Sequence, residues 1–305
     1  MSKFTATILG TTAGMPTKQR GHTAIHISYN DGEETSLLFD CGENTQRQLM
    51  VAGLNMMKID NIFITHWHGD HCLGLPGVVD TLGFEGRKKP LTVYAPESWR
   101  VDDCLSFDHS MADFKAVSRD VSYRGMRVRR TFKNKRFDIM TVPVKHSVPA
   151  VAYAIIEKDK SCIDLRKAIS LGMPESGELY GQLKKKGRVR VGKKKITLKD
   201  ITMTKKGKKV VYSGDTEICR NLRKLVHGAD LLIQDCTYFD EERPEKHYKH
   251  ASLPEVIDMV QKEGVKKTIL THISRKYQDS DKLKELIKDY PNIELAEDFM
   301  KVELQ

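Results

Sequence analysis

The chain has 305 residues, 30% of them charged, and a formal net charge of +10 at pH 7. This length suits one large α/β domain with insertions or two small ones. No apolar run approaches the roughly 18 residues that a membrane-spanning helix needs, and the first residues lack a signal-peptide core, so we expect no membrane association. The six cysteines are scattered, without a Cys-x-x-Cys pair, which favours reduced thiols in the cytoplasm.

Apolar periodicity predicts strands and helices that alternate along the chain. Strands are expected at 4–9, 23–28, 36–39, 61–65, 91–94, 138–144, 151–156, 209–212, 230–234 and 267–271. Helices are expected at about 43–51, after the turn that follows residue 71, at 252–263 and at 280–289. The stretch from 95 to 136 reads as less regular. This alternation fits a four-layer arrangement of helix, sheet, sheet and helix around a cleft.

The segment from Thr65 to His71 concentrates metal-binding side chains directly after an apolar run. It places His66, His68, Asp70 and His71 within six positions. A strand ends here and the chain turns, as in many catalytic loops. Such nitrogen and oxygen donors suit zinc or a similar divalent ion. Two alternating histidines can reach one ion while Asp70 and His71 point toward a second; the alternative is a solvated polar loop.

Four more His and Asp residues end apolar runs with strand character. They are Asp40, His146, Asp215 and His272. A single His or Asp is more often structural than a ligand, but the shared position at strand ends makes these residues candidates for one site. The other histidines, at 22, 26, 109, 227 and 247, lack this context, and we expect them to be structural or solvated.

Positive charge is concentrated in one segment. Between Lys184 and Lys209, thirteen Lys and Arg residues stand against one acid, so the rest of the chain is slightly acidic. Localised charge of this kind favours nucleic-acid binding over a merely solvated face. The Gly-rich stretch before it has few core residues, which predicts a protrusion at about 157–205; the alternative is a disordered surface loop. A smaller basic run consists of Arg124, Arg127, Arg129, Arg130, Lys133, Lys135 and Arg136.

The pattern His-x-His-x-Asp-His is the signature of the metallo-β-lactamase superfamily, and three further segments resemble the ribonuclease Z family over essentially the whole chain. These are 9–20 with Pro-x-Lys-x-Arg at Pro16, Lys18 and Arg20, the segment 39–49, and the segment 171–185, which looks like the family's flexible arm. The resemblance implies an α/β protein: a single four-layer αββα domain over 1–305, with an inserted, protruding tRNA-binding arm at approximately 157–205.

The resemblance also implies two zinc ions per chain. One would be bound by His66, His68, His146 and Asp215, and the other by Asp70, His71, Asp215 and His272. Asp70 would act as general base, a metal-bound hydroxide would attack the phosphodiester, and His250 would protonate the leaving 3′ oxygen. Asp40 would hold a ligand histidine, and Asp235 would orient the catalytic histidine.

By the same resemblance, the chain would be an endoribonuclease that removes the 3′ trailer from pre-tRNA, leaving a 3′-hydroxyl on the tRNA and a 5′-phosphate on the trailer. We expect a cytoplasmic homodimer. The implied substrate-binding residues are Lys18, Arg20, Lys184, Lys185, Lys186, Arg188 and Arg190. One alternative is a phosphodiesterase or sulfatase-like hydrolase of the same fold that acts on small substrates, which would gain nothing from the basic segment. Another is a metal-inactive RNA-binding protein, although no expected ligand is missing.

Overall fold

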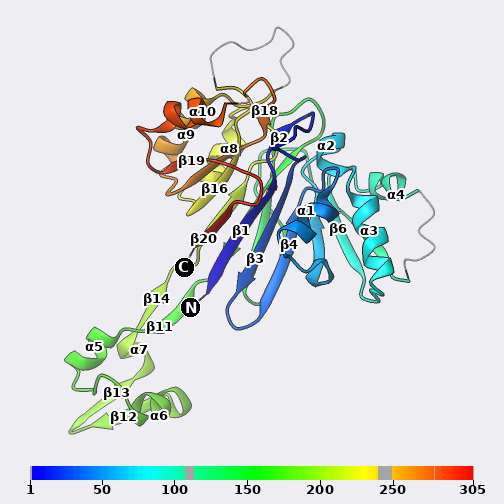
Figure 1. The fold of residues 1–305 in the computed structure, drawn as a ribbon. Coiled ribbons are helices and arrows are strands. Elements are labelled where there is room, and N and C mark those ends of the chain that lie inside the picture. Colours follow the sequence, from blue (N-terminus) through cyan, green and yellow to red (C-terminus); the bar gives the residue numbers. More distant parts are fainter. Residues whose placement is uncertain (1, 107–112, 240–248, 278, 305) are drawn as a thin grey trace. The chain divides into compact units, whose positions relative to one another are not determined.

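The computed structural model describes residues 2–106, 113–239, 249–277 and 279–304 (Figure 1). The chain divides into two compact units. The larger unit comprises residues 1–134, 138–155 and 209–305, and the smaller unit comprises 135–137 and 156–208. Within the described ranges, no helix is long and apolar enough to cross a membrane.

Two seven-stranded sheets form the larger unit. The first has the order β20 (Lys301–Leu304), β1 (Lys3–Gly10), β3 (Ala24–Asn30), β4 (Glu34–Phe39), β5 (Ile59–Phe63), β6 (Leu91–Ala95) and β7 (Ala116–Asp120). The second has the order β19 (Ile293–Leu295), β17 (Thr268–Thr271), β16 (Leu231–Asp235), β15 (Lys209–Tyr212), β10 (Val151–Glu157), β9 (Phe137–Pro143) and β8 (Arg129–Lys133). The short strands β2 (Thr12–Ala13) and β18 (Ile273–Ser274) pair in parallel.

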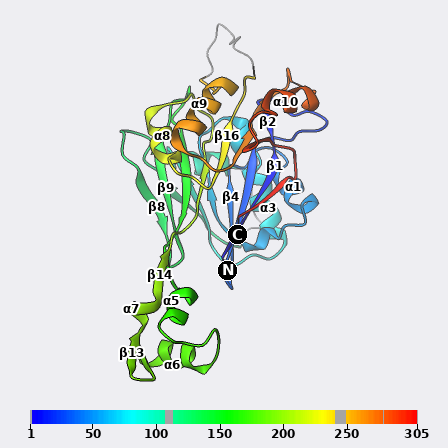
Figure 2. The same cartoon turned by 90° about the vertical axis from the view of Figure 1, so that its left-hand side faces the viewer.

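Helices cover the outer faces of the two sheets. Beside the first sheet lie α1 (Thr45–Val51), α2 (Gly69–Cys72), α3 (Leu75–Phe84) and α4 (Arg100–Cys104), with the 3-10 helix Met56–Lys58. Beside the second lie α8 (Arg220–Val226), α9 (Leu253–Glu263) and α10 (Ser280–Ile287). Figure 2, turned by 90°, shows α8 and α9 in front of the strands of the second sheet. The predicted four-layer αββα arrangement is therefore confirmed.

An aromatic cluster joins the two sheets beneath the site. Phe39 and Phe63, which end β4 and β5, stack with ring centroids 5.0 Å apart. Tyr153 of β10 meets Phe63 edge-on at 5.5 Å, and its hydroxyl donates a hydrogen bond of 2.8 Å to the backbone oxygen of Ile64. All three rings are fully buried. The start of the histidine-rich loop is thus anchored to both sheets.

Parallel strand pairing explains why the candidate His and Asp residues, which follow different strands, meet at one edge of the sheets. In the first sheet β4, β5 and β6 run parallel, and in the second sheet β15, β16 and β17 do so. Of these strands, β16 and β17 are buried along their whole length, as expected of strands covered on both faces. The carboxyl ends of the parallel strands therefore lie together, and ligands in α/β proteins commonly bind at such an edge.

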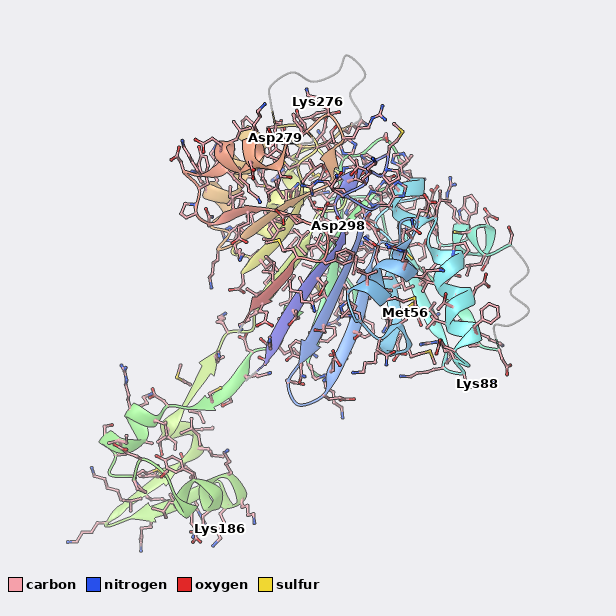
Figure 3. All side chains as sticks on the ribbon, in the orientation of Figure 1. Met56, Lys88, Lys186, Lys276, Asp279 and Asp298 are labelled. Atoms are coloured by element: carbon pink, nitrogen blue, oxygen red, sulfur yellow. The ribbon has the colours of Figure 1, made fainter. Side chains whose placement is uncertain are left out.

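The smaller unit has secondary structure and a core of its own. It contains the antiparallel pair β11 (Lys160–Ile163) and β14 (Thr202–Lys205), the hairpin β12 (Arg188–Val191) and β13 (Lys194–Thr197), and the helices α5 (Leu165–Ser170), α6 (Glu178–Lys186) and α7 (Leu198–Ile201). Its buried residues are Ala168, Met173, Leu183, Val189, Ile196 and Ile201. The Gly-rich stretch contains part of α6 and two residues of this core, Met173 and Leu183. Figure 3 shows the side chain of Lys186 pointing outward from this unit.

Two strands formed where the sequence reads as less regular. β7 and β8 each lie at an edge of their sheet, and most of their side chains are partly or fully exposed. A strand at an edge does not need the apolar alternation that reveals a half-buried strand. The ten predicted strands are all present, and their ends differ from the prediction by at most two residues.

Candidate metal and catalytic centre

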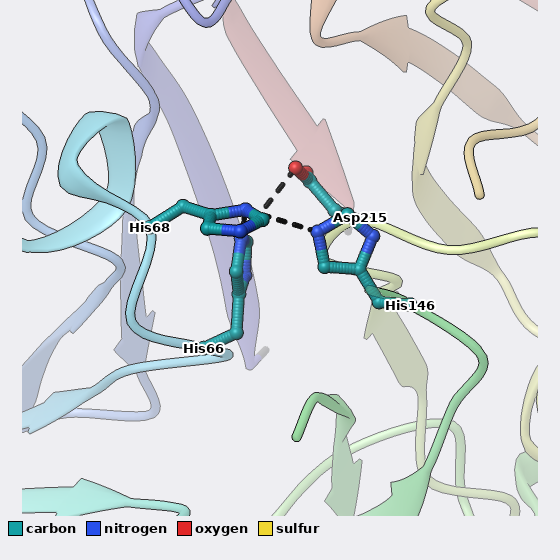
Figure 4. A group of neighbouring side chains, drawn as sticks. All are labelled: His66, His68, His146 and Asp215. Carbon is teal, nitrogen blue, oxygen red and sulfur yellow. Dashed lines mark hydrogen bonds and ion pairs between the residues drawn. The ribbon is translucent and has the colours of Figure 1, made fainter. Parts of the chain in front are cut away.

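Three imidazoles and a carboxylate converge at the end of β5 (Figure 4). Nε2 of His66 and Nε2 of His146 lie 3.1 and 3.0 Å from Nδ1 of His68, and Oδ2 of Asp215 lies 3.6 Å from Nε2 of His66. Bonds of roughly 2.0–2.1 Å to a tetrahedral zinc ion place ligand atoms roughly 3.3 Å apart. The four side chains therefore match the ligand spacing of a divalent metal site.

A second group shares Asp215 with the first. Its Oδ2 lies 3.2 Å from Nε2 of both His71 and His272, and Oδ2 of Asp70 lies 3.3 Å from Nε2 of His272. Nε2 of His71 is buried without a well-formed hydrogen bond to any residue in the described parts of the chain. A buried nitrogen of this kind needs a partner, and a cation between these groups would supply one. The centre thus fits divalent metal ions.

Close packing of two loops brings the second group together. Gly42 follows the end of β4, and a Cβ at this position would lie 2.3 Å from the backbone oxygen of Asp70. Gly214 precedes Asp215 with φ +57, and a Cβ there would lie 2.8 Å from the side chain of Thr65. Only glycine avoids these clashes, so both residues are needed for the ligands to approach one another.

Asp40 belongs to neither ligand group but orients two of the ligand histidines, His71 directly and His66 through Thr65. Nδ1 of His71 lies 2.7 Å from Oδ2 of Asp40, which also accepts a hydrogen bond of 2.7 Å from the hydroxyl of Tyr212. The amide of Thr65 donates to Oδ1 at 2.7 Å, and the Thr65 hydroxyl lies 3.0 Å from Nδ1 of His66. Carboxylates placed in this way fix the orientation of a ligand histidine. Asp40 has φ 55, a strained backbone held by these bonds.

Asp235 plays the corresponding part on the other side of the centre. Nδ1 of His250 lies 2.8 Å from its Oδ2, which also accepts the amide of Thr216 at 3.0 Å. Its Oδ1 accepts the hydroxyl of Thr237 at 2.7 Å, and that hydroxyl lies 2.9 Å from Nδ1 of His272. Although Asp215, Asp235, His250 and His272 lie close enough to hold an ion, the oxygens of Asp235 are already occupied. We therefore interpret Asp235 as a residue that orients His250.

Burial and charge set the protonation of the centre. Burial is the main cause that lowers the pKa of His146 to about 4 and that of His66 well below its usual value, so both are neutral, as metal ligands must be. For Asp70, burial raises the pKa, but His71 and His272 outweigh it and lower the pKa below its usual range. For His71 and His272, burial lowers the pKa, but Asp215 and the neighbouring carboxylates outweigh it, so that the pKa of His71 lies well above its usual value and that of His272 is raised to about 10. The first group therefore contains neutral imidazoles, whereas the second holds its positive charge between ionised carboxylates.

The centre opens into a pocket of about 350 Å³. It is lined by Ala13, Gly14, His68, Asp70, His146, Asp215, Thr237, Tyr238, His250, His272 and Ser274. The ring of His250 lies 5.1 Å from that of His146 and 5.0 Å from that of His272. His250 therefore faces the same pocket as both groups of ligands and can reach a substrate bound there.

The predicted substrate-binding residues lie in different surroundings. Lys18 is exposed, whereas the Arg20 guanidinium donates hydrogen bonds to the Thr11 hydroxyl at 2.7 Å and to the backbone oxygen of Ala296 at 2.8 Å. Arg20 therefore also holds its own loop in place. The remaining five belong to the smaller unit and are exposed: Lys184, Lys185, Lys186, Arg188 and Arg190.

Three positioning residues were not predicted: Thr65, Tyr212 and Thr237. Thr65 is the first residue of the histidine-rich segment, so the motif beside it could have indicated its role. No local sequence pattern indicates a role for Tyr212 or Thr237. Of the histidines expected to be structural or solvated, His22 and His26 are buried and His227 is exposed. His109 and His247 lie outside the described residues.

Two family models match parts of the chain. The model described as Anti-Pycsar protein Apyc1 matches residues 4–161, and the model described as a beta-lactamase superfamily domain matches residues 182–273. Among solved structures, the short form of human tRNase Z has a TM-score of 0.68 at 24% identity and covers 98% of each chain. The metallo-beta-lactamase fold protein YhfI from Bacillus subtilis has a TM-score of 0.66 at 17% identity, covering 99% of this chain and all of that one. These likenesses show the fold.

Curated relatives match both halves of the chain at once. Ribonuclease Z from Methanothermobacter thermautotrophicus is 36% identical over 304 residues, covering 98% of this chain and 96% of its own. Ribonuclease Z from Methanococcus maripaludis is 38% identical over 314 residues, covering 98% and 99%. Each family model covers only one part, whereas these relatives span the fold, the centre and the smaller unit together. The chain belongs to the ribonuclease Z family.

Proposed function

We propose that this chain is a zinc-dependent endoribonuclease that removes the 3′ trailer from pre-tRNA, leaving a 3′-hydroxyl on the tRNA and a 5′-phosphate on the trailer. The observation that carries the proposal is the pair of ligand groups sharing Asp215, next to the hydrogen-bonded pair of His250 and Asp235. The name of the curated relatives supports the activity, and that of the human neighbour supports tRNA as substrate.

Two zinc ions per chain fit these groups. His66, His68, His146 and Asp215 would hold one, and Asp70, His71, Asp215 and His272 the other. When bound, two such ions activate water at neutral pH and stabilise the charge that develops on the phosphate. Asp215 can serve both, because a carboxylate offers two oxygens and its negative charge reduces the repulsion between cations. Zinc is proposed over manganese because histidine nitrogens dominate the set.

Two residues of the centre would move protons. Asp70 is ionised and would accept the proton of the attacking water; its Oδ2 is held by the amide of Gly14 at 2.9 Å. His250 would donate a proton to the leaving 3′ oxygen. Because its Nδ1 faces Asp235, Nε2 is the nitrogen available for that transfer. The partner histidines hold the pKa of Asp235 at about 2 against the effect of burial. The ionised Asp235 would orient His250 for that transfer.

The smaller unit would serve as the arm that binds tRNA. In this proposal the chain is one catalytic domain with an inserted arm at approximately 157–205, and exposed lysines and arginines of the arm contact phosphates. Such contacts position a substrate without reading its bases. A homodimer in the cytoplasm is part of the same proposal; the six free cysteines are consistent with a reducing compartment, and light scattering would measure the oligomeric state.

Incubation with a 3′-extended pre-tRNA tests the activity. We expect one cut near the end of the acceptor stem, with a 3′-hydroxyl on the tRNA fragment and a 5′-phosphate on the trailer, and we expect chelator treatment to abolish it until zinc is restored. Because a pair of metal ions can also act on small phosphate esters, a small-substrate phosphodiesterase of the same fold is the second candidate. A kcat/KM for bis(p-nitrophenyl) phosphate or a cyclic nucleotide above that for pre-tRNA would favour the second candidate and contradict the first.

A further inference from the structure

The smaller basic run of the sequence forms a cationic surface on the larger unit. Arg124, Arg127, Arg129 and Arg130, here called the arginine strip, are all exposed and lie in the β7–β8 connection and at the start of β8. The segment 121–136 contains no acidic residue. Among the described residues, Arg130 lies 3.5 Å from Asp138, whereas no carboxylate pairs with the other three. Nothing in the proposed mechanism uses this charge.

The arginine strip begins close to the catalytic centre. β8 and β9 are antiparallel, and Arg129 stands opposite Thr141, five residues before His146. The side-chain amide of Asn221 donates to the backbone oxygen of Gly125 at 3.2 Å and to that of Pro143 at 2.9 Å. These two hydrogen bonds link the β7–β8 connection to the end of β9, and the chain continues from there directly to His146. A substrate strand that leaves the centre on the side of β9 would pass near the strip.

Apolar and aromatic groups stand between the arginines. Met126 and Val128 are 55% and 37% exposed, and the guanidinium of Arg124 lies 5.3 Å from the centre of the Tyr123 ring. Cations combined with exposed apolar and aromatic surface suit unpaired nucleotides, which offer both phosphates and free base faces. A duplex keeps its bases stacked inside and offers mainly its backbone.

We propose that the arginine strip binds the single-stranded 3′ trailer of the precursor, on the catalytic unit itself. The proposal rests on the function proposed above and adds a second RNA-binding surface to it. The smaller unit would hold the tRNA body, while the strip would hold the strand beyond the cut. Affinity should therefore increase with trailer length, and the strip should account for that increase.

A charge-matched pair of variants tests the strip. The test variant carries Arg124→Gln, Arg127→Gln and Arg129→Gln. The control carries Lys58→Gln, Lys88→Gln and Lys89→Gln, which remove the same charge from exposed positions just before β5 and β6, at the end of these strands away from the metal loop. Binding would be measured for a single-stranded RNA of about 12 nucleotides, a precursor with a trailer of that length, and a precursor with a one-nucleotide trailer.

We expect the test variant to bind the free 12-mer and the long-trailer precursor on the order of 10- to 100-fold more weakly than the control. The slope of log affinity against log salt concentration should decrease by about 2, which is about 0.7 for each of the three lost phosphate contacts. The short-trailer precursor and hydrolysis of bis(p-nitrophenyl) phosphate should change no more than in the control, which also shows that the variant is folded. Equal losses for both precursors would assign the strip to the tRNA stem and overturn the proposal, as would unchanged binding of the 12-mer. If the unmodified protein cuts no precursor, the proposed function fails, while the 12-mer still decides whether the strip binds RNA.

Discussion

Most His and Asp side chains of the centre in the larger unit are buried, whereas most Lys and Arg side chains of the smaller unit are exposed to solvent. His66, His71 and Asp40 are fully buried, and the ligands follow strands distributed along the chain, from residue 66 to residue 272. In the smaller unit, by contrast, Lys184 and Lys186 are exposed on a small core drawn from one continuous segment, 168–201. One region depends on long-range packing and the other on local sequence.

This difference follows from what each region is proposed to do. Acting on a phosphodiester bond requires groups fixed within fractions of an ångström in a low dielectric, where each charge has a large effect. Gripping a polyanion requires only many cations at the surface, where each contributes little and salt screens it. Single substitutions should therefore be severe in the centre and mild in the smaller unit.

The largest effect is expected for Asp215→Ala, because both ligand groups contain this carboxylate. Turnover of pre-tRNA and of a small phosphodiester should fall by more than the roughly 10⁴-fold upper range for loss of a general acid, and elemental analysis should show less than one ion per chain. Asp289→Ala, an exposed residue outside the ligand groups, is the control. Turnover like that of the unmodified protein would show that Asp215 does not join the two groups.

His250→Ala should lower pre-tRNA turnover by roughly 10²–10⁴-fold while the metal content is retained, because only proton donation is lost. A substrate with a nitrophenolate leaving group, which needs no proton, should be affected far less. Asp235→Asn should show the same selectivity in weaker form, since Asp235 acts through His250. An equal loss on both substrates would rule out His250 as the acid.

Replacing residues 160–205 by a short Gly-Ser linker should weaken pre-tRNA binding on the order of 10²-fold, with a salt slope smaller by about 0.7–0.9 per lost phosphate contact. The remaining ends are close, because the amide of Glu157 donates to the backbone oxygen of Lys208 at 2.9 Å. Small-phosphodiester hydrolysis should survive, since no proposed ligand lies in the excised segment. If hydrolysis of the small phosphodiester disappeared while zinc stayed bound, the smaller unit would be part of the catalytic centre. The distinction between a catalytic region and a binding region would then fail.

The smallest effect is expected for Tyr212→Phe, which removes one hydrogen bond to Asp40. Metal affinity, measured by competition with a chelator, should fall about 10-fold, at the lower end for residues that orient ligands. Tyr180→Phe is a matched control: it removes a hydroxyl that donates to the backbone oxygen of Pro174 in the smaller unit at 2.7 Å, and it should leave metal affinity unchanged. A similar decrease in both variants would argue against a specific role for Tyr212.

Local sequence was sufficient to find the candidate ligands and most of the strands that carry them. The His-x-His-x-Asp-His motif and the positions of His146, Asp215 and His272 after apolar runs identified every side chain that now lies in the two ligand groups. The reason is that buried parallel strands need continuous apolar runs, and their polar ends stand out against them. The charge of the smaller unit was equally visible, because exposed lysines need no partner elsewhere in the chain.

Only the tertiary structure decided how these residues work together. Tyr212 reaches Asp40 across 172 residues, and Thr237 links Asp235 to His272; neither has a local signature. The core of the smaller unit was not predicted, because Met173 and Leu183 belong to a cluster whose other members, such as Val189 and Ile201, come from separate elements. A sequence displays periodicity and charge, whereas hydrogen bonds between distant strand ends depend on which sheets pack together, and packing is settled only when the whole chain has folded.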